Sequence, residues 1–121
     1  MKSVLESLEE ITGTAEEIRV SGSFTRSEVW LQILADVLGR EINVPNVEEG
    51  AAYGAAILGF YSLGMLSSID AAADLIGIKK TYFPNKDHQE TYEKLYKIYY
   101  EIYWNLQDQF QQIADFQRNE M

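Results

Sequence analysis

A glycine turn between a short β-type run and an amphipathic helix is the part of this chain best suited to chemistry. Ile18 and Val20 alternate with polar residues, and Gly22 follows between two serines. Glycine permits a backbone turn that a side chain would obstruct. The first N–H groups of the following helix have no partner within that helix, and the helix dipole favours an anion beside them. This pattern indicates a phosphate-binding turn, although a plain strand-to-helix connection would share it.

The helix after this turn is predicted over residues 25–38. One face carries its apolar residues, which are Val29, Trp30, Ile33, Leu34, Val37 and Leu38. Such a stripe is typical of an amphipathic helix. Thr25 followed three residues later by Glu28 predicts a capping box. The Glu28 carboxylate would also compete with a bound anion for the same N–H groups.

The other elements predict a mixed α/β chain. We expect a first helix over 3–11 and strands over 18–20 and 42–44, the second strand ending at Pro45. A further helix should begin at Glu48 or Glu49 and run to about residue 62, and Ser68 should cap a short helix over 68–75. The first helix should bury Val4, Leu5, Leu8 and Ile11. Strand, helix and strand in succession predict a parallel crossover.

Small residues recur four apart at the start of the helix near residue 50. The pairs are Gly50 and Gly54, Ala51 and Ala55, and Ala52 and Ala56. Each interior glycine costs a helix roughly 1 kcal/mol relative to alanine. We therefore expect this face to pack closely against the strands, which would offset the cost.

The region 87–119 has the longest helical pattern of the chain. Its apolar residues recur alternately four and three apart and form an aromatic seam of Tyr92, Tyr96, Tyr99, Tyr103, Leu106, Phe110 and Ile113. Ile98, Tyr100, Ile102 and Trp104 widen the apolar surface further than a solvent-facing helix requires. The seam should be covered, either within a core or by another chain, and a homo-oligomer is expected.

Composition limits the classes of function. The 121 residues have a net charge of −9 and no cysteine, which argues against nucleic-acid binding and excludes disulfides. No apolar run approaches the roughly 20 residues of a membrane span. These features favour a cytoplasmic location. His88 should be a solvated capping residue, Lys79 and Lys80 a solvated surface turn, and no metal site is expected.

Two separated motifs give the chain a specific resemblance. Residues 18–64 contain SGSFTRSEVWLQILADVLGREINVP, followed by Glu49 and GAAYGAAILG. This text resembles the C-terminal nucleotide-binding lobe of the FGGY carbohydrate kinases, whose typical text is close to SGGGARSPLWLQILADVLGRPV, an acidic residue and ALGAA. Phe24, Trp30 and Gln32 are most similar to the gluconate kinase and xylulose kinase members. The weaker resemblance continues through TYFPN to the helix over 87–119 and so covers most of residues 1–121.

The resemblance implies a fold, a reaction and a division of labour. It implies the C-terminal portion of a ribonuclease-H-like, actin-like ATPase lobe that transfers a phosphoryl group from ATP to a sugar or sugar acid. Gly22 and Ser23 would lie against the phosphates, and Phe24 and Ser27 near the adenosine. Ser23 and Phe24 replace glycines of the family pattern. The ligands of Mg²⁺, the sugar site and the catalytic aspartate would belong to an N-terminal lobe.

Two functions from different classes remain open at this point. The first is one wall of an ATP site in a gluconate kinase-like enzyme, with the isolated chain inactive. The alternative is a non-catalytic, oligomerising interaction module, in which the turn at Gly22 is simple connectivity and the aromatic seam mediates assembly.

Overall fold

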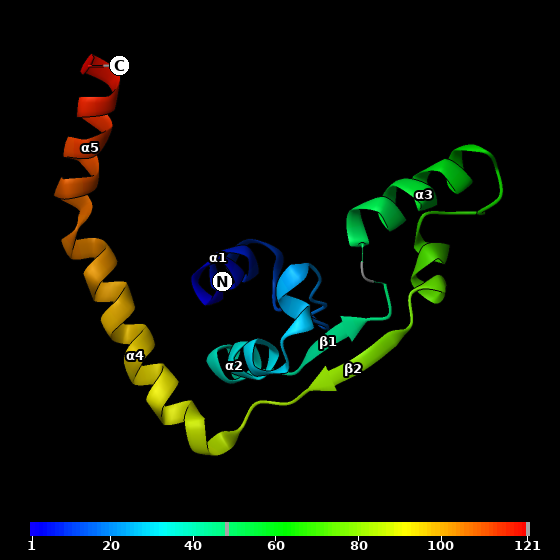
Figure 1. Ribbon diagram of the computed structural model, residues 1–121, viewed down its shortest axis with the longest axis horizontal. Coiled ribbons are helices and arrows are strands. Elements are labelled where there is room, and N and C mark those ends of the chain that lie inside the picture. The colour runs from blue at the N-terminus through cyan, green and yellow to red at the C-terminus, as the bar shows by residue number, and fades with distance from the viewer. Residues whose placement is uncertain (48, 121) are drawn as a thin grey trace.

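The computed structural model describes residues 1–47 and 49–120. Its elements in chain order are α1 (Lys2–Thr12), the 3-10 turn η1 (Ser23–Arg26), α2 (Glu28–Leu38), β1 (Ile42–Pro45), α3 (Gly50–Ser62), the 3-10 turn η2 (Asp70–Leu75), β2 (Ile78–Tyr82), α4 (Lys86–Asn105) and α5 (Gln107–Glu120). Figure 1 shows a central body with helices projecting on both sides. None of the helices among the described residues has the length and apolarity needed to cross a membrane. The helix-rich α/β architecture agrees with the predicted fold class.

The core lies between α2 and the two-stranded antiparallel sheet of β1 and β2. Its buried side chains are Val20, Leu31, Leu34, Ala35, Ile42, Val44 and Tyr82. Ile42 lies directly opposite Tyr82 in the sheet, and the register shifts between Val44 and Pro45. The predicted strand over 42–44 is confirmed, and it ends at Pro45 as expected.

Residues 18–20 run beside β1 in the parallel direction. Arg19 and Asn43 form a parallel bridge. The Val20 N–H donates to the Asn43 carbonyl at 2.9 Å, and the Asn43 N–H donates to the Ile18 carbonyl at 2.8 Å. The strand predicted over 18–20 is thus reduced to a single bridge, but the parallel crossover through α2 is confirmed.

The start of α2 differs from the prediction. Ser27 is the N-cap, and its Oγ accepts a hydrogen bond from the Trp30 N–H at 3.4 Å. Thr25 lies in η1, where its hydroxyl donates to the Gly22 carbonyl at 2.7 Å. The predicted capping box of Thr25 and Glu28 is wrong. Ser27 and not Thr25 is the N-cap, so Glu28 is the first residue of the helix, whereas a capping box needs the carboxylate at the third.

Polar contacts attach α1 to the body. Arg40 Nη1 pairs with Glu9 Oε1 at 2.6 Å, and the Ala15 N–H donates to the same oxygen at 2.8 Å. These contacts, the hydrogen bond from Ala15 above all, lower the pKa of the Glu9 carboxyl. The burial predicted for Val4, Leu5, Leu8 and Ile11 is wrong, since α1 has no buried residue. The apolar face of α1 borders an open groove beside α4 instead of a filled core.

α3 projects from the end of β1, away from α2 (Figure 1). Glu49 is its N-cap and Ser62 its last residue, close to the predicted bounds, whereas Glu48 lies outside the described residues. The predicted close packing of the small-residue face is wrong. Within α3, Ile57 is the one buried residue, and a Cβ added at Gly54 would meet nothing within 4 Å. After its first turn α3 runs away from the sheet (Figure 1), so the strands do not pack against its small-residue face.

η2 and β2 follow α3. Ser68 Oγ accepts a hydrogen bond from the Ala71 N–H at 3.2 Å, which is the contact that the prediction required. The element is a 3-10 turn that begins at Asp70, and Ile69 holds its N-cap position. β2 was not predicted. Lys79 and Lys80 lie within this strand and not in a surface turn, because pairing with a distant strand, β1, extends the backbone there.

A buried carboxylate joins α2 to α4. Asp36 Oδ1 accepts hydrogen bonds from the Asn85 N–H at 2.7 Å and from Gln32 Nε2 at 2.8 Å. His88 Nδ1 lies 2.9 Å from Asp36 Oδ2. His88 is exposed, as predicted, but the N-cap of α4 is Asn85, so the predicted capping role is wrong and the ring instead contacts α2. Burial alone would raise the pKa of the Asp36 carboxyl, but the hydrogen bonds from Asn85, His88 and Gln32 together lower it below 3.8.

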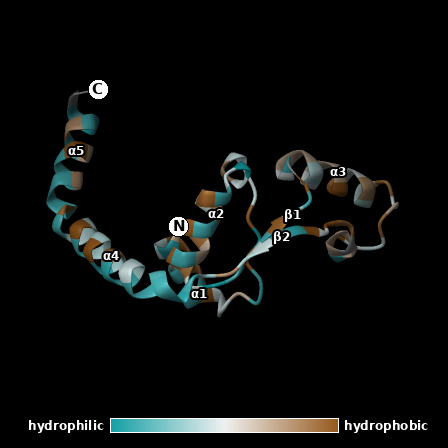
Figure 2. Ribbon diagram, turned by 60° about the horizontal axis from the view of Figure 1, so that its bottom comes forward, coloured by the Kyte–Doolittle hydropathy of each residue, from teal (hydrophilic) through white to brown (hydrophobic). Residues whose placement is uncertain are grey.

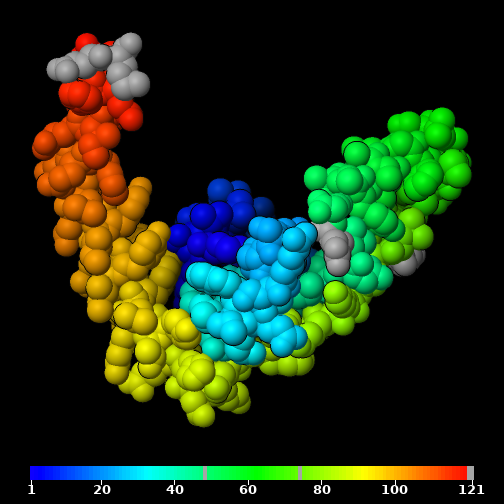
Figure 3. Space-filling view, in the orientation of Figure 1, coloured from blue at the N-terminus to red at the C-terminus, as the bar shows by residue number. Residues whose placement is uncertain are grey.

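The C-terminal helices project on the side opposite α3 (Figure 3). The helix expected over 87–119 is divided at Leu106 into α4 and α5. Neither Tyr99 nor Tyr103 is covered, with exposed fractions of 54% and 49%. Figure 2 shows hydrophobic positions alternating with hydrophilic ones along α4. Tyr92 and Tyr96 at the start of the seam are partly buried, and the Tyr96 hydroxyl donates to Glu6 of α1. The described residues therefore leave the seam beyond Tyr96 largely uncovered.

Replacing the buried carboxylate should loosen α4. Asp36→Ala removes the shared acceptor of Asn85 and Gln32, and we expect a loss of about 2 kcal/mol in the free energy of unfolding. Because the folded pKa of Asp36 is lowered, its stabilisation is fully present above the ordinary pKa of 3.8 and is lost as the pH falls through the lower folded value. Urea denaturation at several pH values measures both effects, with Asp115→Ala, at a half-exposed carboxylate of α5, as control. Equal stability of the two variants at neutral pH would contradict the expectation.

Candidate functional site

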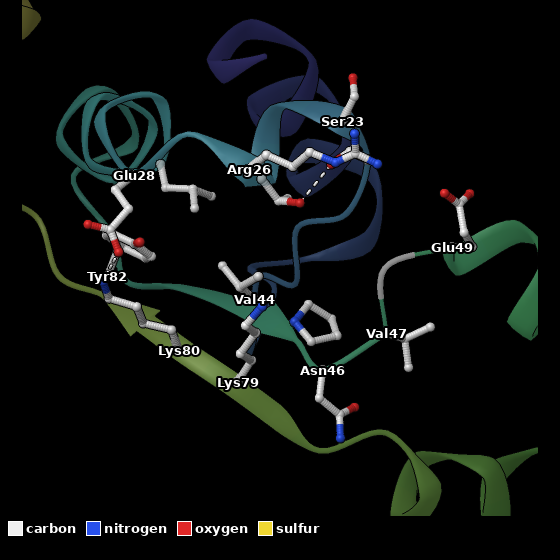
Figure 4. A pocket seen from close by; sticks show the side chains of 14 residues that line it. Ser23, Arg26, Glu28, Val44, Asn46, Val47, Glu49, Lys79, Lys80 and Tyr82 are labelled. Atoms are coloured by element: carbon white, nitrogen blue, oxygen red, sulfur yellow. Dashed lines mark hydrogen bonds and ion pairs between the residues drawn. The ribbon is translucent and has the colours of Figure 1, made fainter.

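A cleft of about 360 Å³ opens at the carboxyl ends of residues 18–20 and β1 (Figure 4). It is lined by Gly22, Ser23, Thr25, Arg26, Glu28, Leu31, Val44, Pro45, Asn46, Val47, Glu49, Lys79, Lys80 and Tyr82. Ligands of open α/β sheets bind in crevices outside the carboxyl ends of parallel strands. The cleft therefore occupies the position that this type of fold uses for ligands.

Cations outnumber carboxylates in the described lining of this cleft. Arg26, Lys79 and Lys80 face Glu28 and Glu49 there, although the chain as a whole has a net charge of −9. Among the described residues, neither Arg26 nor Lys79 forms an ion pair. The described lining of the cleft is therefore more positive than the chain as a whole, and this local charge favours binding of an anion.

Glu28 is already paired in this structure. Its Oε1 lies 2.5 Å from Lys80 Nζ, and this contact lowers the pKa of the Glu28 carboxyl and raises that of the Lys80 ammonium. The Lys80 ammonium also lies 4.7 Å from the centre of the Tyr82 ring. With its charge offset by Lys80, Glu28 opposes an anion in the cleft less than the sequence suggested.

Gly22 turns the chain from residues 18–20 into η1. Its φ of 110° and ψ of 177° lie in a region that is essentially restricted to glycine. Its carbonyl accepts the Thr25 N–H at 3.1 Å as well as the Thr25 hydroxyl. A Cβ at Gly22 would have Phe24 ring atoms 3.9 Å away, so the backbone conformation, and not crowding, requires glycine. The structure brings Gly22 and Ser23 together at the cleft, as expected.

The other two predicted site residues do not line the cleft. Phe24 packs against the core and borders a separate apolar hollow beside Met1 and Trp30. Ser27 is engaged as the N-cap of α2. Both residues fix the turn that presents Gly22 and Ser23, since the Ser27 N–H also donates to the Phe24 carbonyl at 3.0 Å.

Sequence reasoning missed the contribution of β2 to the cleft. Lys79 and Tyr82 reach it from this strand, and the Asn46 N–H donates to the Gly77 carbonyl at 2.9 Å, where β1 has just ended and β2 is about to begin. A signal was present: residues 78–82 combine β-branched and aromatic residues between Gly77 and Pro84, which is typical of a strand. Arg26 has no sequence signal of its own, because a single arginine in a turn is usually solvated.

In the part of the chain that the structure describes, no three His, Cys, Asp or Glu side chains are placed to hold a metal ion. The side chains that the cleft offers, a guanidinium and two ammonium groups beside a glycine turn, fit the phosphates of a nucleotide.

Comparison with known sequences gives consistent matches. Residues 1–63 match the model of the FGGY family of carbohydrate kinases, C-terminal domain. The chain is 39% identical over 106 residues to gluconokinase of Bacillus subtilis, which covers 88% of this chain and 21% of that protein. It is 35% identical over 83 residues to xylulose kinase of Staphylococcus epidermidis, covering 68% and 17% respectively. The chain spans about a fifth of the length of these relatives.

Comparison with solved structures agrees. Xylulose kinase from Lactobacillus acidophilus is similar with a TM-score of 0.72 and 24% identity, over 87% of this chain and 22% of that one. Gluconate kinase from the same organism has a TM-score of 0.71 and 25% identity, over 83% and 21%. These likenesses confirm the predicted fold, which is a portion of an actin-like ATPase lobe.

Two glycine substitutions should have opposite effects on stability. Gly22→Ala forces a side chain into the glycine-only conformation and should lower the free energy of unfolding by about 1–3 kcal/mol. Gly54→Ala, in a helix with open space around the new Cβ, should raise it by roughly 0.5–1 kcal/mol. Urea denaturation followed by circular dichroism compares the two. A Gly22→Ala variant as stable as the Gly54→Ala variant would show that the turn does not need glycine.

Proposed function

The chain belongs to the FGGY family of carbohydrate kinases, and from that premise we propose that it forms one wall of the ATP site in a gluconokinase-type enzyme. The observation that carries this proposal is the cationic cleft at the carboxyl ends of two parallel chain segments. A glycine turn and cationic side chains together favour a phosphate-bearing ligand there. Residues 1–121 act in this proposal as one C-terminal unit, with the motif region at 18–64 and the helical region at 87–119.

Each predicted site residue has a part in this proposal. At Gly22 the backbone can approach the phosphates without a side chain between them. Ser23 offers an N–H and a hydroxyl, both able to donate to a phosphate oxygen. Phe24 and Ser27 belong to the neighbourhood of the adenosine, where they hold the turn in place through the core and the α2 cap.

The remaining machinery is assigned to a partner lobe. ATP supplies the phosphoryl group that is transferred, and the family's reaction places it on a hydroxyl of a sugar or sugar acid. We assign the ligands of Mg²⁺, the sugar site and the catalytic aspartate to an N-terminal kinase lobe, with the cytoplasm as the compartment. Positioning and charge stabilisation account for most of the catalysis in phosphoryl transfer, so a wall that positions ATP contributes directly.

Activity should require the partner lobe. The 121-residue chain alone is expected to give no ATP-dependent phosphorylation of gluconate, xylulose or glycerol above a mock purification, because no catalytic group is assigned to it. A coupled assay for ADP release measures this. Turnover that copurifies with the chain through two further columns would contradict the expectation.

The glycine turn should matter for ATP and not for sugar. In a full-length enzyme that contains this segment, Gly22→Val should raise KM for ATP or lower kcat by about tenfold or more, because a branched side chain strains φ and occupies the phosphate approach. Sugar affinity should be unchanged. Steady-state kinetics with each substrate varied decides the point, with Gly54→Val as the matched control on the open side of α3. Unchanged ATP kinetics would refute the role of Gly22.

A second function, assembly through α4 and α5, is favoured by one specific observation. Apolar side chains surround the second half of α4, where Leu95, Ile98, Tyr99, Ile102 and Tyr103 are each about half exposed. Helices that are apolar on most of their circumference are normally buried. We infer that this surface is covered by another chain, and a homo-oligomer is the simplest form of such cover.

The oligomeric state can be tested directly. Sedimentation equilibrium of the 13.8 kDa chain should give a dimer or larger species at micromolar concentration. The double variant Tyr99→Glu and Tyr103→Glu places two charges in the seam and should dissociate it, whereas Lys97→Glu, outside the seam, should not. A folded, cooperatively melting monomer would show the inference wrong.

A further inference from the structure

Two cations reach the cleft from opposite walls. Arg26 comes from η1 and Lys79 from β2, and Figure 4 shows Arg26 beside Ser23 at one edge of the hollow and Lys79 pointing from β2 toward Val44 at the other. Both residues are exposed, and within the described residues neither forms an ion pair. Lys80 differs, because it is already bound to Glu28. Arg26 and Lys79 are therefore the cations of the cleft that have charge available for a ligand.

The backbone under both side chains is well held. η1 is closed by the hydrogen bond from the Thr25 N–H to the Gly22 carbonyl at 3.1 Å. β2 is paired with β1, and the Asn46 N–H donates to the Gly77 carbonyl just before Lys79. Two cations on separate, fixed walls suit a ligand that carries several negative charges along its length. A single carboxylate could engage one of them, but a chain of phosphates can engage both.

We propose that Arg26 and Lys79 bind the phosphate chain of the nucleotide from opposite walls of the cleft, Arg26 with its planar guanidinium and Lys79 as a mobile point charge. The choice of a nucleotide rests on the proposed function. The polyphosphate chemistry rests on the cleft itself. Lys79 thereby becomes a residue that positions the ligand, and β2 becomes part of the site.

Isothermal titration calorimetry of the 121-residue chain at low salt tests this proposal with four probes: ATP, inorganic tripolyphosphate, adenosine and gluconate. Tripolyphosphate and ATP should bind. Arg26→Gln and Lys79→Gln should each weaken both by about tenfold, the loss of one charge-assisted hydrogen bond. Lys94→Gln removes the same charge from an exposed residue of α4 and should leave both affinities unchanged. Circular dichroism confirms that each variant is folded.

A variant that is expected to strengthen binding distinguishes an effect on ligand recognition from an effect on folding. Glu28→Gln removes a carboxylate from the cleft and releases Lys80, so it should tighten tripolyphosphate binding severalfold. A disturbed fold would weaken binding instead. The proposal would be overturned if Glu28→Gln left the affinity for tripolyphosphate unchanged and the Arg26, Lys79 and Lys94 variants all weakened it equally. The chain would then attract polyanions through its exposed cations in general and not through a defined site.

The probes also distinguish this inference from the proposed function. The assignment of Arg26 and Lys79 to the phosphates fails if adenosine and ATP bind but tripolyphosphate does not. It also fails if Arg26→Gln and Lys79→Gln bind tripolyphosphate as tightly as the unaltered chain. In both cases the proposal of a wall of the ATP site still stands. If tripolyphosphate binds and depends on both cations but adenosine contributes nothing to ATP affinity, the anion site stands and the ATP wall fails. Tighter binding of gluconate than of tripolyphosphate would overturn the assignment in favour of a carboxylate site.

Discussion

Two backbone hydrogen bonds between residues 18–20 and β1 place everything else in the candidate site. They join the Val20 N–H to Asn43 and the Asn43 N–H to Ile18, so the two segments run parallel and end side by side. The crossover between them must then pass over one face, where α2 covers the core. Because both segments end at the same edge, their following loops meet there. The cleft is the direct consequence of that meeting.

Electrostatics gives the cleft a character that the chain as a whole lacks. An acidic chain repels anions at long range, yet salt largely screens such repulsion beyond about 10 Å at 0.1 M. Over shorter distances the local groups decide, and here Arg26 and Lys79 stand beside a Glu28 whose charge is offset by Lys80. The ion pair adds little to folding stability because both partners are exposed. The ion pair instead changes the electrostatic potential inside the cleft, which acts on a bound ligand.

The distribution of apolar surface separates this chain from a self-contained domain. Its core cluster consists of seven buried residues around α2 and the sheet, whereas α1 and α4 have no buried residue at all. Polar contacts such as Arg40 with Glu9 and Asp36 with Asn85 attach these helices to the body. Burial of apolar area yields roughly 25 cal/mol per Å², so the uncovered helices retain a large capacity for association. The membership of the chain in a family of much longer proteins accounts for such surfaces.

The sequence alone determined the elements whose information is local. The alternation at 42–44 and the glycine at position 22 each follow from periodicity or from one residue's conformational freedom. The stripe predicted for α2 does not coincide with its buried face: Leu31, Leu34 and Ala35 are its buried apolar residues, whereas Val29 and Trp30 are exposed because the core lies on the other side of them. Two motifs in order also determined the family. The tertiary structure decided what depends on distant partners: β2, which brings Lys79 to the cleft, and the bond of Asp36 to His88, 52 residues away. It also decided that α3 leaves the sheet and that the helices after Pro84 stay uncovered. A local pattern specifies which face of a helix is apolar, but only the path of the chain specifies what lies opposite that face.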